Sequence, residues 1–428
     1  MILKQGSKGS LVSLLQLGLQ RSGFAPGPKD GIYGPKTTNA VIEFQKNHGL
    51  APDGIAGPQT ILKIRPYLVG YTTYTIKPGD TLYNISRRLY STVPLIENAN
   101  AGLDALNLTP GTNIIVPYNF SLTPTDIPMS SLLCELICEG LAVRYPFIFL
   151  SAIGRSAWGK TIPALRMGRG RKRVFLNASH HANEWITTQV VLKYVEEYAK
   201  AIVNAENLNG ANSEYMFDEN TLYIVPMVNP DGVDLVTGAI TNGEPGYIYA
   251  KKISENYPQI SFPQGWKANL QGTDLNLNYP ALWEKAKQIK FSQGFTSPAP
   301  RDYVGPEPLS APESRAVLEY TRQNNFNITI SFHTQGEEIY WQFENYANEK
   351  ALRLGIEMAN ASGYKLTSPE EGSSYAGYKD WFLMEYRRPG YTVEAGLGIN
   401  PLPIYDFWRI YPQCAAIITT ALIFEEEK

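Results

Sequence analysis

Residues 174–184 read VFLNASHHANE and carry the clearest signal of secondary structure in this chain. Its first half is apolar and partly β-branched, which predicts a buried strand, and the small and polar residues after it predict a loop. Residues 184–203 then show the apolar periodicity of an amphipathic helix. A strand that leads through a polar loop into a helix is typical of an α/β sheet.

His181 and Glu184 lie three residues apart at this strand-to-helix turn, where both side chains can face one point. A zinc ion takes an imidazole and a carboxylate as ligands, and a third protein ligand with one open position makes such a site catalytic. The four histidines of the chain stand at positions 48, 180, 181 and 333, and His333 directly follows a strand-like run at residues 328–332. A His-x-x-Glu pair alone more often marks a capped helix start. Together with His333, it predicts a metal site.

Length and composition limit the class of protein. With 428 residues, the chain is long enough for two or three domains with real cores. The net charge of −2 argues against a nucleic-acid partner, and no stretch approaches the 18 apolar residues of a membrane span. The three cysteines, Cys134, Cys138 and Cys414, cannot all pair with one another and are predicted to be buried thiols.

The N-terminal residues 1–6 read MILKQG, without the positive region and apolar core of a secretory signal peptide. We therefore expect a soluble protein that is cytoplasmic at synthesis.

Residues 1–68 contain an internal repeat, in which DGIYGPKT at 30–37 returns as DGIAGPQT at 53–60. Each copy combines Asp-Gly and Gly-Pro turns with a helix start, and residues 11–19 and 37–45 have helical periodicity. The pattern predicts a small helical bundle. It resembles the peptidoglycan-binding domain of many cell-wall hydrolases, which implies a peptidoglycan partner; the alternative is a helical dimerisation module.

Residues 72–118 predict a strand, two helices and a strand. The markers are YTIKPGDTL at 74–82, ISRRL at 85–89, IENAN at 96–100 and LTPGTNIIVP at 108–117. The segment is similar to a LysM module, which implies binding to chains of N-acetylglucosamine. Two adjacent wall-binding modules would increase avidity for a polymer. The polar, proline-containing residues 119–126 are the predicted linker to the rest of the chain.

From residue 126 to residue 428, strands alternate with helices, which predicts an α/β fold with a mixed, mostly parallel sheet and helices on both faces. The candidate helices are 130–145, 184–205, 311–324 and 348–361, and the candidate strands are 147–153, 173–178, 221–228, 328–332 and 390–393. Polar residues follow four of these strands, namely His181 with Glu184, Asn229, His333 and Glu394. Ligands of open α/β sheets bind at that edge.

Several motifs in this region occur in the order and context of zinc carboxypeptidases: GRSAWGKTI at 154–162, HANEW at 181–185, NPDG at 229–232, DLNLNYP at 274–280, SFH at 331–333 and YTVE at 391–394. The resemblance spans the C-terminal 300 residues or so. It implies a carboxypeptidase-like fold in which His181, Glu184 and His333 hold one Zn²⁺. It also implies that Glu394 takes the proton of the water at the fourth position.

The resemblance assigns two further residues. Asp274 stands where the family keeps an aspartate that orients the first ligating histidine. Lys267 stands at the position of the arginine that stabilises the tetrahedral oxyanion, where a lysine would act as a point charge. The alternatives are a turn aspartate and a surface lysine.

The sequence departs from the family at Leu277. Carboxypeptidases carry Asn-Arg where this chain has Asn276 and Leu277, and that arginine grips the terminal carboxylate of the substrate. Its loss disfavours an ordinary carboxypeptidase. The DLNLNYP version resembles γ-D-glutamyl-diamino-acid endopeptidases, which cut bacterial stem peptides between D-glutamate and meso-diaminopimelate.

Residues 378–381 read YKDW and precede Glu394 where the family lines its specificity pocket. Asp380 is our candidate for reading a cationic group of the diamino acid, with Lys379, Arg387 or Arg388 as possible carboxylate partners; the alternative is a solvated charge cluster. Tyr375 loosely matches the family's mobile tyrosine.

Three functions are weighed on this basis. The first is a zinc endopeptidase of peptidoglycan stem peptides, delivered by two wall-binding modules. The second is a metallocarboxypeptidase acting on peptides or muropeptides, and the third is a wall-binding protein without activity. The absent signal peptide is unexpected for a wall substrate, and an enzyme made inside a spore-forming cell that acts on spore wall or on recycled muropeptides would reconcile the two. The bond, the compartment and the oligomeric state are left open.

Overall fold

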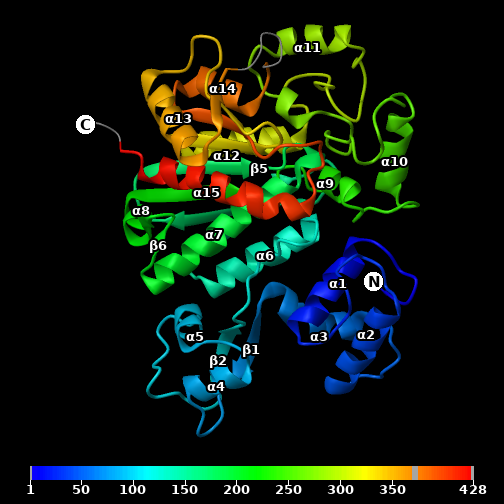
Figure 1. Ribbon diagram of the computed structural model, residues 1–428, viewed down its shortest axis with the longest axis vertical. Coiled ribbons are helices and arrows are strands. Elements are labelled where there is room, and N and C mark those ends of the chain that lie inside the picture. The colour runs from blue at the N-terminus through cyan, green and yellow to red at the C-terminus, as the bar shows by residue number, and fades with distance from the viewer. Residues whose placement is uncertain (1, 369–374, 426–428) are drawn as a thin grey trace. The chain divides into compact units, whose positions relative to one another are not determined.

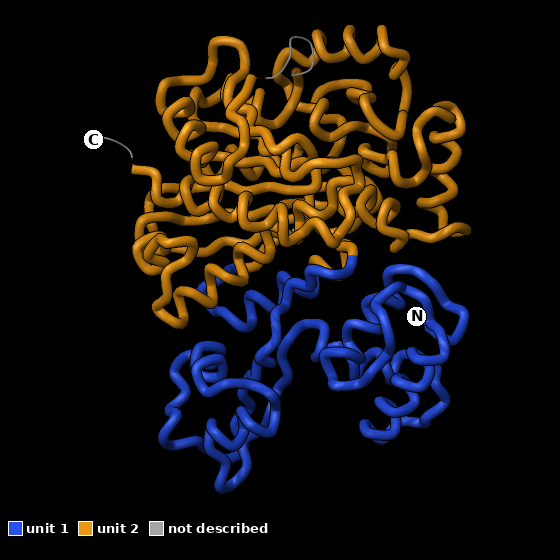
Figure 2. Tube along the Cα trace, viewed as in Figure 1, with its two compact units in different colours: residues 1–127, 135–149 blue, residues 128–134, 150–428 orange. Residues whose placement is uncertain are grey.

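The computed structural model describes residues 2–368 and 375–425. The chain divides into two compact units, residues 1–127 with 135–149 and residues 128–134 with 150–428 (Figure 2). The division at residue 127 lies beside the predicted boundary at 126, but residues 135–149 group with the first unit. Helix α6 (Ser131–Arg144) therefore spans the division. The boundaries 1–68, 72–118 and 126–428 stay predictions.

The first part of unit 1 is helical, as the repeat predicts. Its helices are α1 (Ser10–Arg21), α2 (Pro35–Asn47) and α3 (Pro58–Val69) (Figure 1). Both α2 and α3 start with a proline directly after a glycine. Proline suits the first helical position because its missing N–H would lack a helical partner there in any case.

The two repeats build the same hydrogen-bond network. The Gln16 Nε2 atom donates to Asp30 Oδ1 at 3.1 Å and to Thr37 Oγ1 at 3.2 Å, and the Gly31 N–H donates to Gln16 Oε1 at 3.0 Å. Gln45 repeats this pattern with its partners at 2.9, 3.1 and 3.0 Å, which are Asp53, Thr60 and Gly54. The amide of each glutamine thus ties an Asp-Gly turn to the start of the helix that follows it.

The second part of unit 1 has the predicted order of strand, helix, helix and strand. These elements are β1 (Tyr71–Thr75), α4 (Leu82–Arg88), α5 (Val93–Ala99) and β2 (Asn113–Pro117), with β1 and β2 antiparallel. Threonines cap both helices, because Thr81 accepts from the Asn84 N–H and Thr92 from the Leu95 N–H.

Eight of the described strands of unit 2 form one sheet in the order β11-β10-β12-β9-β5-β8-β4-β3, and the short strands β6 and β7 pair separately. Strands β12, β9, β5 and β8 run parallel, whereas β10 and β4 are antiparallel to β12 and β8. The sheet is therefore mixed and mostly parallel, as predicted. Its strands are β3 (Phe149–Arg155), β4 (Thr161–Gly168), β5 (Lys172–Ala178), β8 (Asn220–Val225), β9 (Ile328–His333), β10 (Glu338–Tyr340), β11 (Lys365–Thr367) and β12 (Gly390–Glu394).

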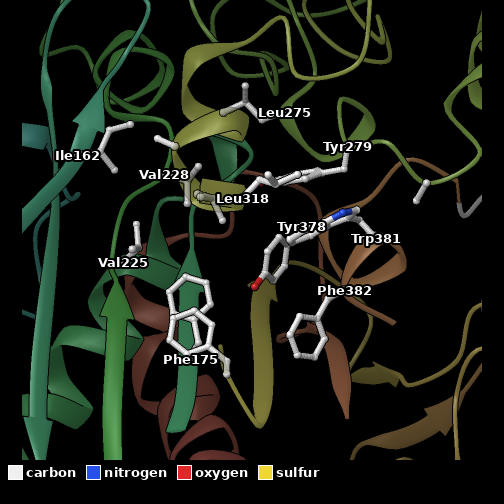
Figure 3. Close-up of a cluster of buried hydrophobic side chains, with 14 of the residues drawn as sticks. Ile162, Phe175, Val225, Val228, Leu275, Tyr279, Leu318, Tyr378, Trp381 and Phe382 are labelled. Atoms are coloured by element: carbon white, nitrogen blue, oxygen red, sulfur yellow. The ribbon is translucent and has the colours of Figure 1, made fainter. Parts of the chain in front are cut away.

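Helices cover both faces of this sheet (Figure 1). On one face, aromatic residues of α14 pack with Phe175 of β5 in a buried cluster (Figure 3). Helix α7 contacts β5 and α15 on the other face. The remaining helices and strands are η1 (Ala182–Glu184), α7 (Ile186–Asn204), β6 (Asn207–Leu208), β7 (Ala211–Asn212), α8 (Ser213–Glu219), α9 (Pro230–Val236), α10 (Pro245–Ser254), η2 (Leu275–Leu277), α11 (Trp283–Ser292), α12 (Pro312–Asn324), α13 (Glu349–Ser362), α14 (Tyr378–Tyr386), η3 (Ile404–Asp406) and α15 (Phe407–Ile423).

Two predicted bounds shift for local reasons. The strand predicted for residues 221–228 ends at Val225, because Pro226 has no N–H to donate to a neighbouring strand. The helix predicted from residue 184 begins at Ile186 and is preceded by the 3₁₀ turn η1.

Cys134, Cys138 and Cys414 are buried thiols, as predicted. Within residues 2–368 and 375–425, no helix has both the length and the apolar character needed to cross a bilayer.

Candidate metal centre

Three parallel strands deliver the predicted ligands and base to one edge of the sheet. His181 and Glu184 follow β5: His181 directly precedes η1 and Glu184 is its last residue, and the i and i+3 side chains of a 3₁₀ turn point the same way. His333 is the last residue of β9 and Glu394 the last of β12, and the two are register partners. Because β5, β9 and β12 run parallel, their carboxyl ends meet at this edge.

The donor atoms of the three candidate ligands converge. Glu184 Oε2 lies 2.9 Å from His333 Nδ1, and Glu184 Oε1 lies 3.0 Å from His181 Nδ1. The two Nδ1 atoms are 3.2 Å apart. A tetrahedral zinc ion with bonds of about 2.0–2.1 Å holds its ligand atoms roughly 3.4 Å from one another. The donor set and its spacing therefore fit zinc, and the site can hold it.

Burial and charge keep two ligands in their metal-binding forms. The side chains of Glu184 and His333 are each only 1% exposed. Burial lowers the pKa of His333, which favours the neutral imidazole. Burial alone would raise the pKa of Glu184, but His181 and Lys267 lower it well below its usual range. A neutral imidazole beside a carboxylate anion is the form that binds a divalent cation.

His181 carries a proton that a metal must displace. Burial lowers its pKa, but the carboxylates of Glu184 and Asp274 outweigh burial and raise the pKa to about 9. Zinc binding should therefore release a proton from this ring at neutral pH.

Asp274 contacts the opposite edge of that histidine ring. Asp274 Oδ1 lies 3.0 Å from His181 Nε2, and Asp274 Oδ2 accepts a hydrogen bond from the Asp302 N–H at 3.1 Å. Burial raises the pKa of Asp274, but His181 outweighs burial and lowers it. A carboxylate that accepts from Nε2–H leaves the Nδ1 lone pair directed at the ligand cluster. This geometry suits the orienting role that the sequence predicts.

Lys267 and Glu394 complete the charges around the centre. Lys267 Nζ lies 3.1 Å from Glu184 Oε1. Burial raises the pKa of Glu394, and the negative charge of Glu184 adds to this, so that it reaches about 8. A carboxylate with a high proton affinity, placed beside a cation, can act as a general base.

A cavity of about 300 Å³ lies over the centre. The predicted site residues line it, except the buried Glu184 and His333 and the possible carboxylate partners Arg387 and Arg388. The lining residues are His181, Lys267, Asp274, Asn276, Leu277, Lys290, Arg301, Asp302, Tyr340, Tyr375, Gly377, Lys379, Asp380, Thr392 and Glu394.

Leu277 contributes an apolar wall to the cavity. Its side chain packs against a small buried cluster that contains Trp283 and Val304. Asn276 stands beside it, and its Oδ1 accepts a hydrogen bond from the Tyr378 N–H at 3.0 Å. The wall therefore offers no cation at the position where carboxypeptidases place their arginine.

Asp380 has close partners within the protein. Its Oδ1 lies 2.5 Å from Lys379 Nζ, and its Oδ2 accepts from the Gly377 N–H at 3.1 Å at the start of α14. A substrate cation would have to compete with Lys379 for this carboxylate, so the proposed reading of a diamino acid stays a prediction. Arg387 and Arg388 are not among the lining residues.

Tyr375 lines the cavity with its hydroxyl held in place. The Lys285 Nζ donates to its hydroxyl oxygen at 3.0 Å, and the same ammonium lies 4.5 Å from the ring centroid. Its comparison with the family's mobile tyrosine stays a prediction.

Sequence reasoning missed six lining residues: Lys290, Arg301, Asp302, Tyr340, Gly377 and Thr392. One of them had a usable signal, since Thr392 is two residues before Glu394 and so lies on the same face of β12. Arg301 and Asp302 lie in an irregular segment, and only the tertiary fold brings them to the cavity.

Comparisons with known proteins agree with this geometry. Family models match for zinc carboxypeptidase at residues 135–396, for a peptidoglycan binding domain at 8–64 and for the LysM domain at 74–117.

Two relatives are similar over most of the chain. Gamma-D-glutamyl-L-diamino acid endopeptidase 1 of Lysinibacillus sphaericus is 40% identical over 307 residues, which cover 71% of this chain and 72% of that protein. The YqgT protein of Bacillus subtilis is 39% identical over 284 residues, which cover 66% and 74%. Among solved structures, bovine thrombin-activatable fibrinolysis inhibitor in complex with tick carboxypeptidase inhibitor shares the fold. Its TM-score is 0.54 at 20% identity, and the match covers 70% of this chain and 97% of that one.

Proposed function

Because the chain belongs to the zinc carboxypeptidase family and is a metallopeptidase, we propose that it cuts bacterial stem peptides at the γ-D-glutamyl–meso-diaminopimelate bond. The observation that carries this proposal is the apolar wall at Leu277 in an otherwise complete metallopeptidase pocket. Without a clamp there for a terminal carboxylate, an endopeptidase is favoured over a carboxypeptidase. The name of the Lysinibacillus relative supports the same bond.

His181, Glu184 and His333 would hold one Zn²⁺ in this enzyme. When bound, zinc supplies an activated water and polarises the scissile carbonyl. Asp274 keeps His181 in the ligating tautomer through its contact with Nε2.

Two side chains would then carry the proton and the charge. Glu394 takes a proton from the attacking water and delivers it to the leaving amine, and its high proton affinity suits both steps. Lys267 lines the cavity beside Glu184 and neutralises the negative charge that develops on the carbonyl oxygen. As a point charge, Lys267 would stabilise this oxyanion without the second hydrogen bond of an arginine.

The two N-terminal modules would hold the enzyme on its polymer. We assign peptidoglycan binding to residues 8–64 and N-acetylglucosamine chains to residues 74–117, because these segments match the corresponding families. Simultaneous binding at both modules raises the local concentration of stem peptides at the catalytic unit. The enzyme should therefore associate with the wall. The spore wall stays a prediction, and comparing pull-down by vegetative sacculi with pull-down by spore cortex would test it.

The deciding experiment is digestion of L-Ala-γ-D-Glu-meso-diaminopimelate and of its D-Ala-extended tetrapeptide, with products identified by mass. Chelator-sensitive release of L-Ala-D-Glu from both peptides would support the proposal, and added zinc should restore the activity. Loss of only the terminal D-alanine would instead identify a carboxypeptidase, which is the alternative function. The Glu394→Gln protein serves as the control for contaminating peptidases.

A further inference from the structure

One carboxylate at the cavity is shared by two cations. Asp302 Oδ1 lies 2.6 Å from Lys290 Nζ, and Asp302 Oδ2 lies 2.5 Å from Arg301 Nε. Within the described parts of the chain, neither cation forms a second ion pair. One carboxylate neutralises one positive charge, so this group carries a net positive charge of one.

Other cations of the cavity lining have their own carboxylates. Lys379 pairs with Asp380, and Lys267 with Glu184. The uncompensated positive charge of the lining is therefore concentrated at Lys290 and Arg301. An anionic group of a substrate gains most by binding there.

Arg301 has the free edge that such a group needs. Its Nε is used by Asp302, whereas its Nη1 and Nη2 atoms have no hydrogen-bond partner in the part of the chain that the structure describes. Two neighbouring guanidinium nitrogens match the two oxygens of a carboxylate, which makes a bidentate contact possible. The Arg301 side chain is 43% exposed, so a ligand can reach it.

The backbone holds Arg301 close to the metal centre. The Pro300 carbonyl accepts from the Lys267 N–H at 2.7 Å, and the Asp302 N–H donates to Asp274 Oδ2 at 3.1 Å. Both chain neighbours of Arg301 are therefore hydrogen-bonded to residues beside the metal centre, namely Lys267 and Asp274. Partial burial lowers its pKa, but Asp302, Asp274 and Glu184 outweigh burial and raise it. The guanidinium therefore lies within electrostatic reach of the ligand cluster.

We propose that Arg301, with Lys290 beside it, forms a carboxylate-binding subsite that replaces the clamp missing at Leu277. This inference rests on the proposed function, because stem peptides supply the ligand. They carry an α-carboxylate on the γ-linked D-glutamate and further carboxylates on diaminopimelate. Both sources present the same chemistry to a guanidinium, and amidated peptides distinguish them.

The test compares three substrates and three variants. The substrates are L-Ala-γ-D-Glu-meso-diaminopimelate, its D-isoglutamine analogue and its analogue amidated on diaminopimelate. The variants are Arg301→Gln, Arg301→Lys and the control Arg169→Gln. Arg169 makes the same kind of contact, Nε to Asp218 Oδ1 at 2.7 Å, but is not among the residues that line the cavity.

We expect Arg301→Gln to lower kcat/KM on the unmodified tripeptide roughly tenfold to a hundredfold, mainly through KM. On the analogue in which the carboxylate bound by Arg301 is amidated, the kcat/KM of this variant should equal that of wild type. The kcat/KM of Arg301→Lys should lie between those of wild type and Arg301→Gln, because lysine keeps the positive charge but cannot make the bidentate contact of a guanidinium. Zinc content should stay at one per chain in all variants, and Arg169→Gln should behave as wild type.

Equal losses on all three substrates would overturn the subsite, since Arg301 would then act on a feature that they share. Unchanged kinetics would overturn it as well. Calorimetric binding of the three peptides to the zinc-loaded wild type and Arg301→Gln proteins separates this inference from the proposed function. If peptides bind but none is cleaved at the predicted bond, the proposed function fails. If binding shows no coupling between Arg301 and any carboxylate, the subsite fails.

Discussion

The helical module contains two glutamine networks, and the catalytic unit contains the metal centre. Both kinds of site are built from polar side chains around a carboxylate, yet they differ in how far apart in the sequence the interacting residues lie. Gln16 and Gln45 find their side-chain partners within 21 residues of the chain. The metal centre joins Glu184 to His333 across 149 residues, and His181 to Asp274 across 93. The first network closes local turns. The second gathers groups that no local structure would place together.

The two networks also differ in how charge is treated. Each glutamine is a neutral amide whose donors and acceptors are met by turns and a threonine. The metal centre instead buries charged groups, with Glu184 and Asp274 beside His181 and Lys267, and three of its side chains converge where a metal ion can bind. We therefore expect changes in the first network to alter stability and changes in the second to alter chemistry.

The largest effect should come from Glu184→Gln, which removes the anionic ligand. A neutral amide is a weak zinc ligand, so the variant should lose stoichiometric zinc and fall at least about a thousandfold in activity. Metal analysis after dialysis, together with tripeptide cleavage, checks this. Retention of one zinc per chain would contradict the ligand assignment.

Glu394→Gln should lower activity while leaving zinc binding intact, which would distinguish the general base from the metal ligands. Removing a general base typically lowers kcat by about 10²–10⁴-fold. Zinc content and binding to sacculi should be unchanged, because Glu394 is absent from the ligand cluster. Single-turnover cleavage with parallel metal analysis measures both properties. Near-normal activity would assign the base to another residue.

Asp274→Asn should have a smaller and recoverable effect. Loss of a carboxylate that orients a ligating histidine typically weakens metal affinity about 10–100-fold. We expect cleavage to fall in dilute zinc and to recover largely when zinc is supplied in excess. Competition with a chromophoric chelator gives the affinity. Wild-type affinity would show that the contact with His181 does not support the metal.

Gln45→Ala should lower stability without lowering activity, which is the opposite of the effects expected at the metal centre. It leaves the buried Thr60 and Gly54 groups without their glutamine partner, which should destabilise the helical module by about 1–3 kcal/mol. Cleavage of soluble tripeptide should not change. Gln16→Ala is the matched variant and should behave alike because its network is the same. Thermal unfolding and tripeptide kinetics together provide the test, and a large loss of kcat in either variant would show that this network affects the catalytic unit as well as stability.

The smallest expected effect is a loss of stability of the helical module at acidic pH. A backbone hydrogen bond from Ile32, with Gln16, lowers the pKa of Asp30 below its ordinary value of 3.8, and Asp53 is lowered by the equivalent groups. A carboxylate with a lowered folded pKa stabilises the fold above that ordinary value, and this contribution disappears as the pH falls through the folded pKa. Hydrogen exchange of α2 amides should therefore slow less on acidification to pH 3 than intrinsic rates predict. Asp30→Asn with Asp53→Asn should remove that excess.

Much of the molecule was predictable because its signals are local. The repeated Asp-Gly and Gly-Pro turns predicted the helical module, and the turn and cap residues of 74–117 predicted its strand, helix, helix and strand order. The antiparallel strands β10 and β4, each next to an edge strand of the sheet, were not predicted, since strand direction depends on pairing with distant neighbours. Asp380 was predicted to face a substrate, yet its ion pair with Lys379 and its cap at α14 come from the local turn.

The pairing of His181 with Glu184 follows from the local sequence, because a spacing of three residues at a strand-to-helix turn aligns both side chains. The approach of His333 and Glu394 to this pair depends on the parallel pairing of β5, β9 and β12. The position of Arg301 at the same cavity likewise depends on the tertiary fold. Contacts across such separations form only when burial of the whole sheet compensates for the entropy of closing long loops.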